Sequence, residues 1–472
     1  MKLQASSYLL AQKDKLKEII AILAKEFAYV SILGTDVDGK MYVVSTTKSA
    51  IEPSMDQERG FVLRVFQDTG VSEYSFNVVD VSYVVDRVRE IAKKDRERFR
   101  AKGILPYAKA PSDEPATVYH LGEAKCLPQN DDPGEILARL QAIHDANIGT
   151  CEEVSFLQLT HSVTQINKIF LSPHRDLYQS YAYANATIVA LATDGEKRKI
   201  EYKGLSLLGG SELLDEVEAN VPGVCARAVE LLSAERVEPG EYDIVCEPDF
   251  TGLIAHEAFG HGTEMDMFVK HRAKGEEYLN KRVASDVVVM HDGASAIEEV
   301  SSYAFDDEGN LANDTVIIDH GIFKRGMCDT LSAIQLGVEP TGNGKRESYK
   351  RKAYTRMTNT FFEGGTDSLE EMIASISHGY LLEGMHSGME DPKNWGIQCV
   401  AAKAREIQDG KLTGKIVSPV YLTGYVPDLL ESISMVSPKV EMSGTGYCGK
   451  GWKEWVKTST GGAYIKARGK LS

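Results

Sequence analysis

Apolar residues repeat at helical spacing over residues 8–27, which predicts an amphipathic helix near the start of the chain. A β-rich run follows at Tyr29–Leu33, and Asp38-Gly39 lies between two β-rich runs, as is typical of a hairpin turn. A second helix is expected to begin near Val81. This order of helix, antiparallel strands and helix predicts an N-terminal α+β domain over residues 1–103.

The middle of the chain predicts a second unit of helices and antiparallel strands. Residues 104–132 contain four prolines and little periodicity, which is typical of a linker. A helix at 134–146 and a series of strand-like runs follow, and Asp194-Gly195 joins the last two runs as a hairpin. Pro222 lies within a helical pattern and is expected to kink or divide it. We assign residues 104–235 to this central domain.

Glu238-Pro239-Gly240 is the clearest break in the chain. A buried strand at Tyr242–Cys246 and a helix at Phe250–Gly260 are expected after it, followed by many β-rich runs with tight turns between them. We therefore predict a C-terminal domain over residues 236–472 that is rich in antiparallel strands. The fold class predicted for the whole chain is α+β, with mixed or antiparallel sheets.

Composition and charge exclude several classes of protein. The 472 residues are 43% hydrophobic and 26% charged, a mixture typical of globular proteins and not of disordered or collagen-like chains. Lysine and arginine number 53 against 69 aspartate and glutamate residues, so the formal net charge is -16. A strongly anionic surface repels phosphate backbones, so we expect no nucleic-acid partner.

The cysteine content indicates a reducing compartment. Seven cysteines are spread along the chain without a C-x-x-C pair, and an odd, unpaired set argues against a disulfide framework. The first 13 residues lack the sustained apolar run of a signal peptide, and no apolar stretch approaches the 18 residues needed to cross a membrane. We expect a cytoplasmic protein with no membrane partner.

The segment His256-Glu257-Ala258-Phe259-Gly260-His261 carries the most informative chemistry. Zinc proteases commonly use H-E-x-x-H on a helix, but here the second histidine comes five residues after the first. At about 100° per residue, positions five apart point about 140° away from each other on a regular α-helix. Either a π-type turn aligns the two rings or the helix stops at Gly260. Glu257 would then be the general base.

Two histidines do not complete a catalytic zinc site, which normally has three protein ligands. The third ligand could be a later histidine, an acid such as Glu264 or Asp266, or a cysteine. Cys448 is the strongest of these candidates, because four glycines in residues 444–451 let a thiolate approach another part of the structure closely. The alternative is coincidence, with His256 and His261 as structural histidines and Cys448 as a free thiol in a surface loop.

The chain resembles the TldD/PmbA (TldE) metalloprotease family, on the TldD side. The resemblance is carried by His256–Glu264, by Arg356-Met357-Thr358-Asn359-Thr360 and by Gly446-Tyr447-Cys448-Gly449-Lys450. It covers nearly the whole chain and is strongest after residue 240. TldE-type members lack the histidine motif, so this chain resembles the catalytic type.

The resemblance implies a zinc-dependent peptidase that acts on unfolded or extended polypeptides. It implies one zinc ion per chain, held by His256, His261 and Cys448, with Glu257 activating a water molecule at the metal. It also implies a dimer, formed either with a second copy or with a TldE-like chain, in which the substrate enters as an extended strand.

Further residues have both a functional and a structural interpretation. Glu264 and Asp266 could orient a ligating histidine, and His378 and His386 could line the cleft, although each of these residues is also compatible with a purely structural role. A basic stretch over residues 345–356, which includes Lys345 and ends at Arg356, either holds a peptide carboxylate or carbonyl near the cleft or is a solvated loop.

Two other functions are compatible with the same residues. A metal-dependent amidase or deacylase for small molecules would need the same ligands and a different cleft. A non-catalytic binding module, such as a modulator of gyrase or of an antitoxin, would not need Glu257 at all.

Overall fold

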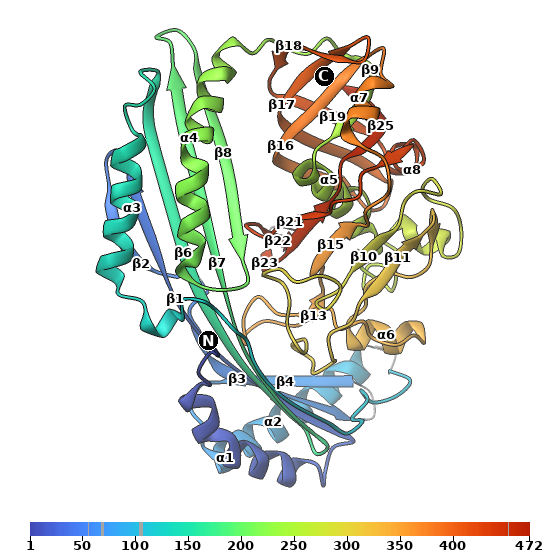
Figure 1. The fold of residues 1–472 in the computed structure, drawn as a ribbon. Helices are drawn as coiled ribbons and strands as arrows, with labels where there is room; N and C mark the ends of the chain where they lie inside the picture. Colours follow the sequence, from blue (N-terminus) through green and yellow to red (C-terminus); the bar gives the residue numbers. More distant parts are fainter. Residues whose placement is uncertain (55, 68–69, 103–106, 452) are drawn as a thin grey trace.

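The computed structural model describes residues 1–472 except 55, 68–69, 103–106 and 452 (Figure 1). Its N-terminal part is built on a long, curved eight-stranded sheet. The main strand order is β4-β3-β1-β6-β7-β5, with β2 beside β1 and β8 beside β7. The strands are β1 (Tyr29–Ser45), β2 (Ser49–Pro53), β3 (Glu58–Gln67), β4 (Gly70–Phe76), β5 (Ala116–Leu121), β6 (Val154–Leu171), β7 (Arg175–Thr193) and β8 (Arg198–Leu207).

Two pairs of helices cover different ends of this sheet. Helices α1 (Ser7–Leu23) and α2 (Val81–Ala101) lie at its lower end in Figure 1, and α3 (Pro133–Asn147) and α4 (Leu214–Glu230) lie at its upper end. Each pair buries its apolar stripe in a separate core cluster with the strands beneath it. The predicted helices are confirmed, and α4 runs through Pro222 without being divided.

The prediction of a hairpin turn at Asp38-Gly39 is wrong. Strand β1 continues through both residues, and Gly39 pairs with Thr164 of β6. A Cβ atom at Gly39 would lie 2.6 Å from the Val163 carbonyl oxygen, so the glycine permits a close strand approach and does not form a turn. By contrast, the hairpin at Asp194-Gly195 is confirmed, because β7 ends at Thr193 and β8 begins at Arg198.

Residues 104–132 are more ordered than a linker, insofar as the structure describes them. Strand β5 lies within this range and pairs with β7 as a parallel edge strand, with Tyr119 stacked on Tyr178 at 5.2 Å between ring centroids. The eight-stranded sheet thus contains strands from both 1–103 and 104–235, and the division into three domains stays a prediction.

The C-terminal part contains two larger sheets and several short elements. A seven-stranded sheet has the order β16-β9-β25-β19-β17-β18, with β20 beside β25, and a six-stranded sheet has the order β12-β11-β10-β15-β24-β21. The first sheet consists of β9 (Gly240–Cys246), β16 (His378–Asp391), β17 (Gly396–Gln408), β18 (Lys411–Val417), β19 (Val420–Tyr425), β20 (Met435–Val436) and β25 (Ile465–Leu471).

The second sheet consists of β10 (Met290–Asp292), β11 (Thr315–Asp319), β12 (Ile322–Phe323), β15 (Asn359–Phe362), β21 (Glu441–Ser443) and β24 (Ser459–Gly462). Two separate hairpins are formed by β13 (Gly344–Lys345) with β14 (Tyr354–Thr355), and by β22 (Tyr447–Lys450) with β23 (Lys453–Lys457). The short helices are α5 (Pro248–Ile254), α6 (Thr330–Leu336), α7 (Leu369–Ala374) and α8 (Val426–Glu431). Most neighbouring strands in these sheets are antiparallel, so the predicted α+β class is confirmed.

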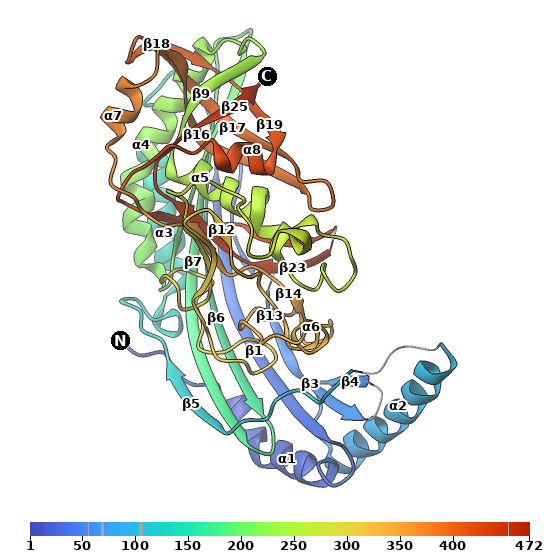
Figure 2. The same ribbon diagram turned by 90° about the vertical axis from the view of Figure 1, so that its right-hand side faces the viewer.

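The largest apolar core lies in the C-terminal part and packs around α5 and the sheet above it. The C-terminal part faces the long strands of the N-terminal sheet, with the β22–β23 hairpin between the two in Figure 1. Figure 2 shows the same sheet curving behind the C-terminal part and down to α1. Buried ion pairs cross this boundary, including Arg64 of β3 with Glu308. None of the helices in the described residues is long and apolar enough to cross a membrane.

Candidate metal centre

A local change of helix type brings the two motif histidines together. Helix α5 ends at Ile254, a π-helical turn spans Ala255–Gly260, and a 3-10 turn spans His261–Thr263. A π-helix has more residues per turn than an α-helix, so side chains five positions apart point to the same side. Of the two geometries left open by the sequence, the π-type turn is the one observed.

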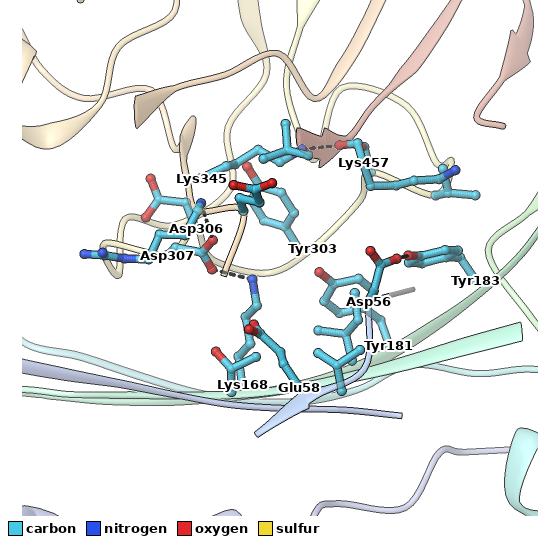
Figure 3. Close-up of a pocket in the computed structure, with 18 of the residues that line it drawn as sticks. Asp56, Glu58, Lys168, Tyr181, Tyr183, Tyr303, Asp306, Asp307, Lys345 and Lys457 are labelled. Carbon is cyan, nitrogen blue, oxygen red and sulfur yellow. Dashed lines mark hydrogen bonds and ion pairs between the residues drawn. The ribbon is translucent and has the colours of Figure 1, made fainter. Parts of the chain in front are cut away.

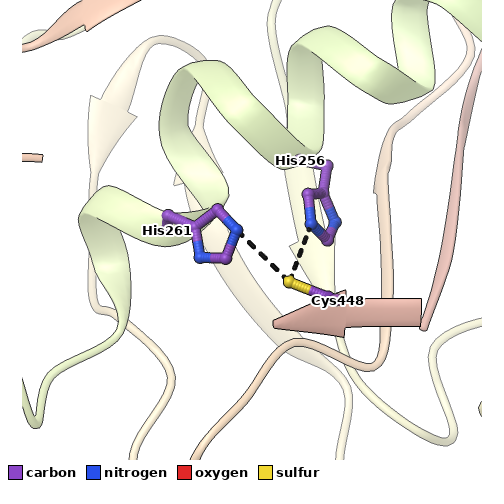
Figure 4. Close-up of side chains that lie close together, drawn as sticks. All are labelled: His256, His261 and Cys448. Atoms are coloured by element: carbon purple, nitrogen blue, oxygen red, sulfur yellow. Dashed lines mark hydrogen bonds between the residues drawn. The ribbon is translucent and has the colours of Figure 1, made fainter. Parts of the chain in front are cut away.

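Cys448 of β22 completes a compact group with these histidines (Figure 4). Its Sγ atom lies 3.2 Å from His256 Nε2 and 3.3 Å from His261 Nε2. The three donor atoms all lie within 4.8 Å of one another, and the two imidazole rings meet edge to face with centroids 5.0 Å apart. Donor atoms from segments almost 200 residues apart thus point at one small volume.

The electrostatics of the group favour a thiolate. Burial raises the pKa of the Cys448 thiol, but the neighbouring His256 and His261 outweigh burial and lower this pKa to about 4. Burial lowers the pKa of the His261 imidazole, but Cys448 and Glu264 outweigh burial and raise this pKa above its usual value. A thiolate is the form of cysteine that binds metal ions.

A buried set of charged residues holds His261 and the β22 loop in place. Glu264 Oε2 lies 3.4 Å from His261 Nδ1 and accepts a hydrogen bond from Lys450 Nζ at 3.0 Å. Burial raises the pKa of Glu264, but Lys450, His261 and Arg356 together lower it well below its usual range. Lys450 also donates to Asp266 at 2.7 Å, so both acids predicted near a ligand are tied to the same lysine.

Arg356 is fully buried and contacts the backbone of Cys448. Its guanidinium donates a hydrogen bond to the Cys448 carbonyl oxygen at 2.7 Å and lies 3.4 Å from Glu264. Arg356 therefore fixes the backbone of the residue that supplies the sulfur, and it does not itself line the cleft.

Glu257 lies in the same cleft as the three donors, a cavity of about 510 Å³. The cleft is also lined by Gly388 of β16, where a Cβ atom would lie 2.3 Å from Glu257 Cγ. The absence of a side chain at Gly388 thus leaves room for Glu257. By contrast, His378 and His386 are exposed, and neither lines the cleft, although both belong to β16. His378 packs against Tyr242 instead.

Sequence reasoning assigned no role to two further residues at the cleft. Lys450 stands two positions after Cys448 in the glycine-rich loop, and its ties to Glu264 and Asp266 depend on a distant segment. Glu390 of β16 lines the cleft with its carboxylate oxygens buried, and burial raises its pKa well above the usual range. No local sequence signal distinguishes Glu390 from an exposed acid.

Comparison with known proteins gives a consistent result. Residues 239–468 match the PmbA/TldA metallopeptidase C-terminal domain. A metalloprotease of Methanothermobacter thermautotrophicus is 32% identical over 281 residues, which cover 59% of this chain and 61% of the relative. A zinc metalloprotease TldD homolog of Saccharolobus solfataricus is 26% identical over 66% of this chain and 70% of the relative. The chain thus spans only part of the length of the relatives it matches.

The whole fold also has a close counterpart among solved structures. A putative modulator of a DNA gyrase from Thermotoga maritima superimposes with a TM-score of 0.79, covering 98% of this chain and 100% of the other at 16% sequence identity. At that identity the likeness establishes a shared fold, including the N-terminal part that lies outside the matched C-terminal domain.

Proposed function

Because the chain belongs to the TldD/PmbA metallopeptidase family, we propose that it is a zinc-dependent peptidase for unfolded or extended polypeptides. The observation that carries this proposal is the convergence of His256, His261 and Cys448 in the cleft that also holds Glu257. A metal, a base and open space for a substrate are the minimum that hydrolysis of a peptide bond requires.

The donor set fits zinc. Two imidazole nitrogens and one thiolate are common zinc ligands, and three protein ligands are typical of a catalytic site with an open position. The low thiol pKa of Cys448 means that this ligand is already deprotonated at neutral pH. One zinc ion per chain on these residues would polarise the substrate carbonyl and make a nearby water molecule more acidic.

Glu257 is proposed to transfer a proton from the attacking water to the leaving amine. Its carboxylate takes a proton from the attacking water, and the resulting carboxylic acid gives that proton to the amine nitrogen as the peptide C–N bond breaks. Glu257 thereby returns to the carboxylate form after each turnover. Because Gly388 has no side chain, strand β16 can lie close to Glu257 without displacing it from the cleft.

The preference for extended chains is supported by the hairpin that carries Cys448. In the described part of the chain, β22 and β23 pair with no strand other than each other, and residues 447–451 of this hairpin line the cleft. An extended peptide can pair with backbone groups of such a hairpin that have no other partner, through hydrogen bonds that do not depend on side-chain sequence. Most backbone groups of a folded protein are already paired within it and so cannot bind in this way.

Replacing Glu257 by glutamine tests the proposal. We expect Glu257→Gln to lower the rate of hydrolysis of unfolded casein by about a hundredfold or more, with the zinc content unchanged because Glu257 is not a ligand. The exposed Glu277→Gln serves as a matched control and should keep full activity. Undiminished hydrolysis by Glu257→Gln would contradict the mechanism, and hydrolysis of short acyl amides alone would favour a small-molecule amidase.

The expected assembly and location are part of the same proposal. We keep the expectation of a dimer, with a second copy or with a TldE-like chain, and light scattering of the purified chain alone and with such a partner tests it. The cytoplasmic location remains a prediction from the seven cysteines, none of which is paired in a disulfide in the structure.

A further inference from the structure

A second cavity lies between the long N-terminal sheet and the C-terminal part (Figure 3). It has a volume of about 100 Å³, and we call it the polar cavity. Lys168 and Tyr183 line it from the sheet, and Lys345 and Lys457 line it from the C-terminal part. Tyr447 and Trp455 line both the polar cavity and the metal cleft, so the two spaces meet at the β22–β23 hairpin.

Cys448 and Lys457 project from opposite faces of the hairpin. In its register Tyr447 faces Lys457, and Cys448 faces Val456. Side chains alternate along a strand, so Cys448 projects from one face and the Tyr447–Lys457 pair projects from the other. The sulfur ligand and the polar cavity are therefore separated by a single residue step along β22.

The acids that line the polar cavity already have partners. Asp56 Oδ2 accepts hydrogen bonds from the Tyr183 hydroxyl at 2.7 Å and from the Tyr447 hydroxyl. The other acids pair as follows: Asp307 with Lys168, Asp306 with the Gly344 N–H group, Glu58 with the Tyr349 N–H group, and Glu347 with Arg351. Each of these five carboxylates thus has at least one hydrogen-bond or ion-pair partner in the protein.

Two lysines of the cavity, Lys345 and Lys457, make no ion pair within contact distance among the described residues, although nearby acids act on both from farther away. Lys345 Nζ donates only to backbone carbonyls, those of Met357 at 3.2 Å and of Lys457. Lys457 Nζ is buried without a hydrogen-bond acceptor among the described residues, and it lies over the rings of Tyr447 and Tyr183, with centroids at 4.4 and 5.4 Å.

This arrangement has a physical cost that a ligand would relieve. Burial lowers the pKa of Lys457 to about 7, and burial together with Arg356 lowers the pKa of Lys345 to about 7. A buried ammonium group is stabilised by a hydrogen-bonded anion, and a cavity that keeps two such groups unpaired is suited to an anionic ligand. The basic stretch predicted from the sequence thus places its first residue, Lys345, in this cavity.

We propose that the polar cavity binds a carboxylate of the peptide substrate through Lys457 and Lys345. This inference rests on the proposed peptidase function and specifies the substrate: a polypeptide with a carboxylate, terminal or on a side chain, a short distance from the bond that is cleaved. The peptide would run from the metal cleft past Tyr447 and Trp455 and place its carboxylate in the cavity.

Equilibrium binding to the zinc-loaded Glu257→Gln protein tests the proposal without turnover. Three probes are compared by calorimetry: N-acetyl-pentaalanine with a free terminal carboxylate, its C-terminal amide, and N-acetyl-tetraalanyl-glutamate amide. We expect at least one carboxylate-bearing probe to bind about tenfold or more tightly than the neutral amide. The two carboxylate probes distinguish a terminal carboxylate from a side-chain carboxylate.

Adding Lys457→Met should reduce this preference to less than about twofold, and Lys345→Met provides a second variant if the first does not fold. Lys439→Met is the matched control, because Lys439 is exposed and paired with Glu441, and it should keep the preference. Equal binding of all three probes, or an equal loss for all three in both cavity variants, would overturn the proposal.

Failure of the proposed function gives a different result. If the wild-type protein hydrolyses none of these probes or unfolded casein, the peptidase proposal falls, while a Lys457-dependent preference in the binding experiment would still identify the cavity as a carboxylate site.

Discussion

Cys448 is the residue on which the candidate metal centre depends most directly. It supplies the only thiolate of the three donors, and its thiol pKa is lowered to about 4 by the histidines beside it. We expect Cys448→Ala to bind far less zinc than the wild-type protein, which should hold about one zinc ion per chain. Plasma emission spectrometry on dialysed protein measures both.

Cys399 offers a matched control for that substitution. It is buried in the same core cluster, but burial raises the pKa of its thiol well above the usual range, and it belongs to no donor group. Cys399→Ala should therefore keep its zinc. Equal zinc contents in Cys448→Ala and the wild-type protein would show that the metal, if bound, does not need the sulfur.

The two cavity lysines predict a pH dependence for carboxylate binding. Their pKa values of about 7 apply to the empty cavity, and a bound anion would raise them. Below pH 7 both are already charged and the preference for the carboxylate probe is complete, whereas above pH 7 binding must take up protons and weakens. Groups that act on the two lysines are Asp56, Lys168, Asp292, Glu299, Asp307 and Arg356.

We therefore expect the ratio of amide to carboxylate dissociation constants to fall about tenfold or more between pH 6.5 and pH 9. Calorimetry with the same probes measures this ratio, and binding of the neutral amide should change little. A constant ratio over this range would mean that the lysines do not titrate in the way their burial requires.

At the scale of elements, the π-helical turn and strand β16 act together. The turn aligns His256 and His261, and β16 lies so close that Gly388 has no room for a Cβ atom beside Glu257. The pairing of a helical irregularity with a close strand explains how a motif with a five-residue histidine spacing still forms one site.

The close contact between Gly388 and Glu257 predicts that adding one methyl group at position 388 impairs catalysis. Gly388→Ala should displace Glu257 and lower the rate of peptide hydrolysis by about tenfold or more, with zinc content unchanged. Gly396→Ala on the neighbouring strand β17 is the matched control, since a Cβ atom there meets nothing within 4 Å. Steady-state kinetics on unfolded casein checks both, and full activity in Gly388→Ala would show that Glu257 can move without loss.

At the scale of the whole molecule, buried charges join the N-terminal sheet to the C-terminal part. Arg64 of β3 pairs with Glu308 and with Glu73, and Arg346 also pairs with Glu73. Burial opposes the charge on Arg64, but Glu308 and Glu73 raise the pKa of its guanidinium well above the usual value. Removing one partner from such a buried group leaves an uncompensated charge.

Glu308→Gln should therefore lower the free energy of unfolding by about 2 kcal/mol or more, measured by urea denaturation. The exposed pair of Arg89 with Glu26 gives the comparison, and Glu26→Gln should leave the unfolding transition unchanged because solvent screens that pair. Effects of similar size in both variants would mean that the boundary is not held by its buried charges.

Local sequence patterns were enough to predict several elements of the fold. The helices over 7–23 and 133–147, the hairpin at Asp194-Gly195 and the α+β class all follow from short-range periodicity and turn chemistry. Asp38-Gly39 shows the limit of such patterns, since the same two residues can form a turn or allow a close strand contact. The register with β6 decides between them, and β6 begins more than 100 residues later.

The sequence by itself determined that His256, Glu257 and His261 form one local unit, because five residues of chain fix their separation. It also singled out Cys448 as a ligand candidate through its glycine-rich surroundings. Only the tertiary structure decided that Cys448 meets His256 across 192 positions and that His378 and His386 lie outside the cleft. It also decided that Lys345 and Lys457 share a cavity in which neither makes an ion pair with a described residue. The charge states of Cys448, Lys345 and Lys457 depend on burial and on distances between remote segments, and a local stretch of sequence determines neither.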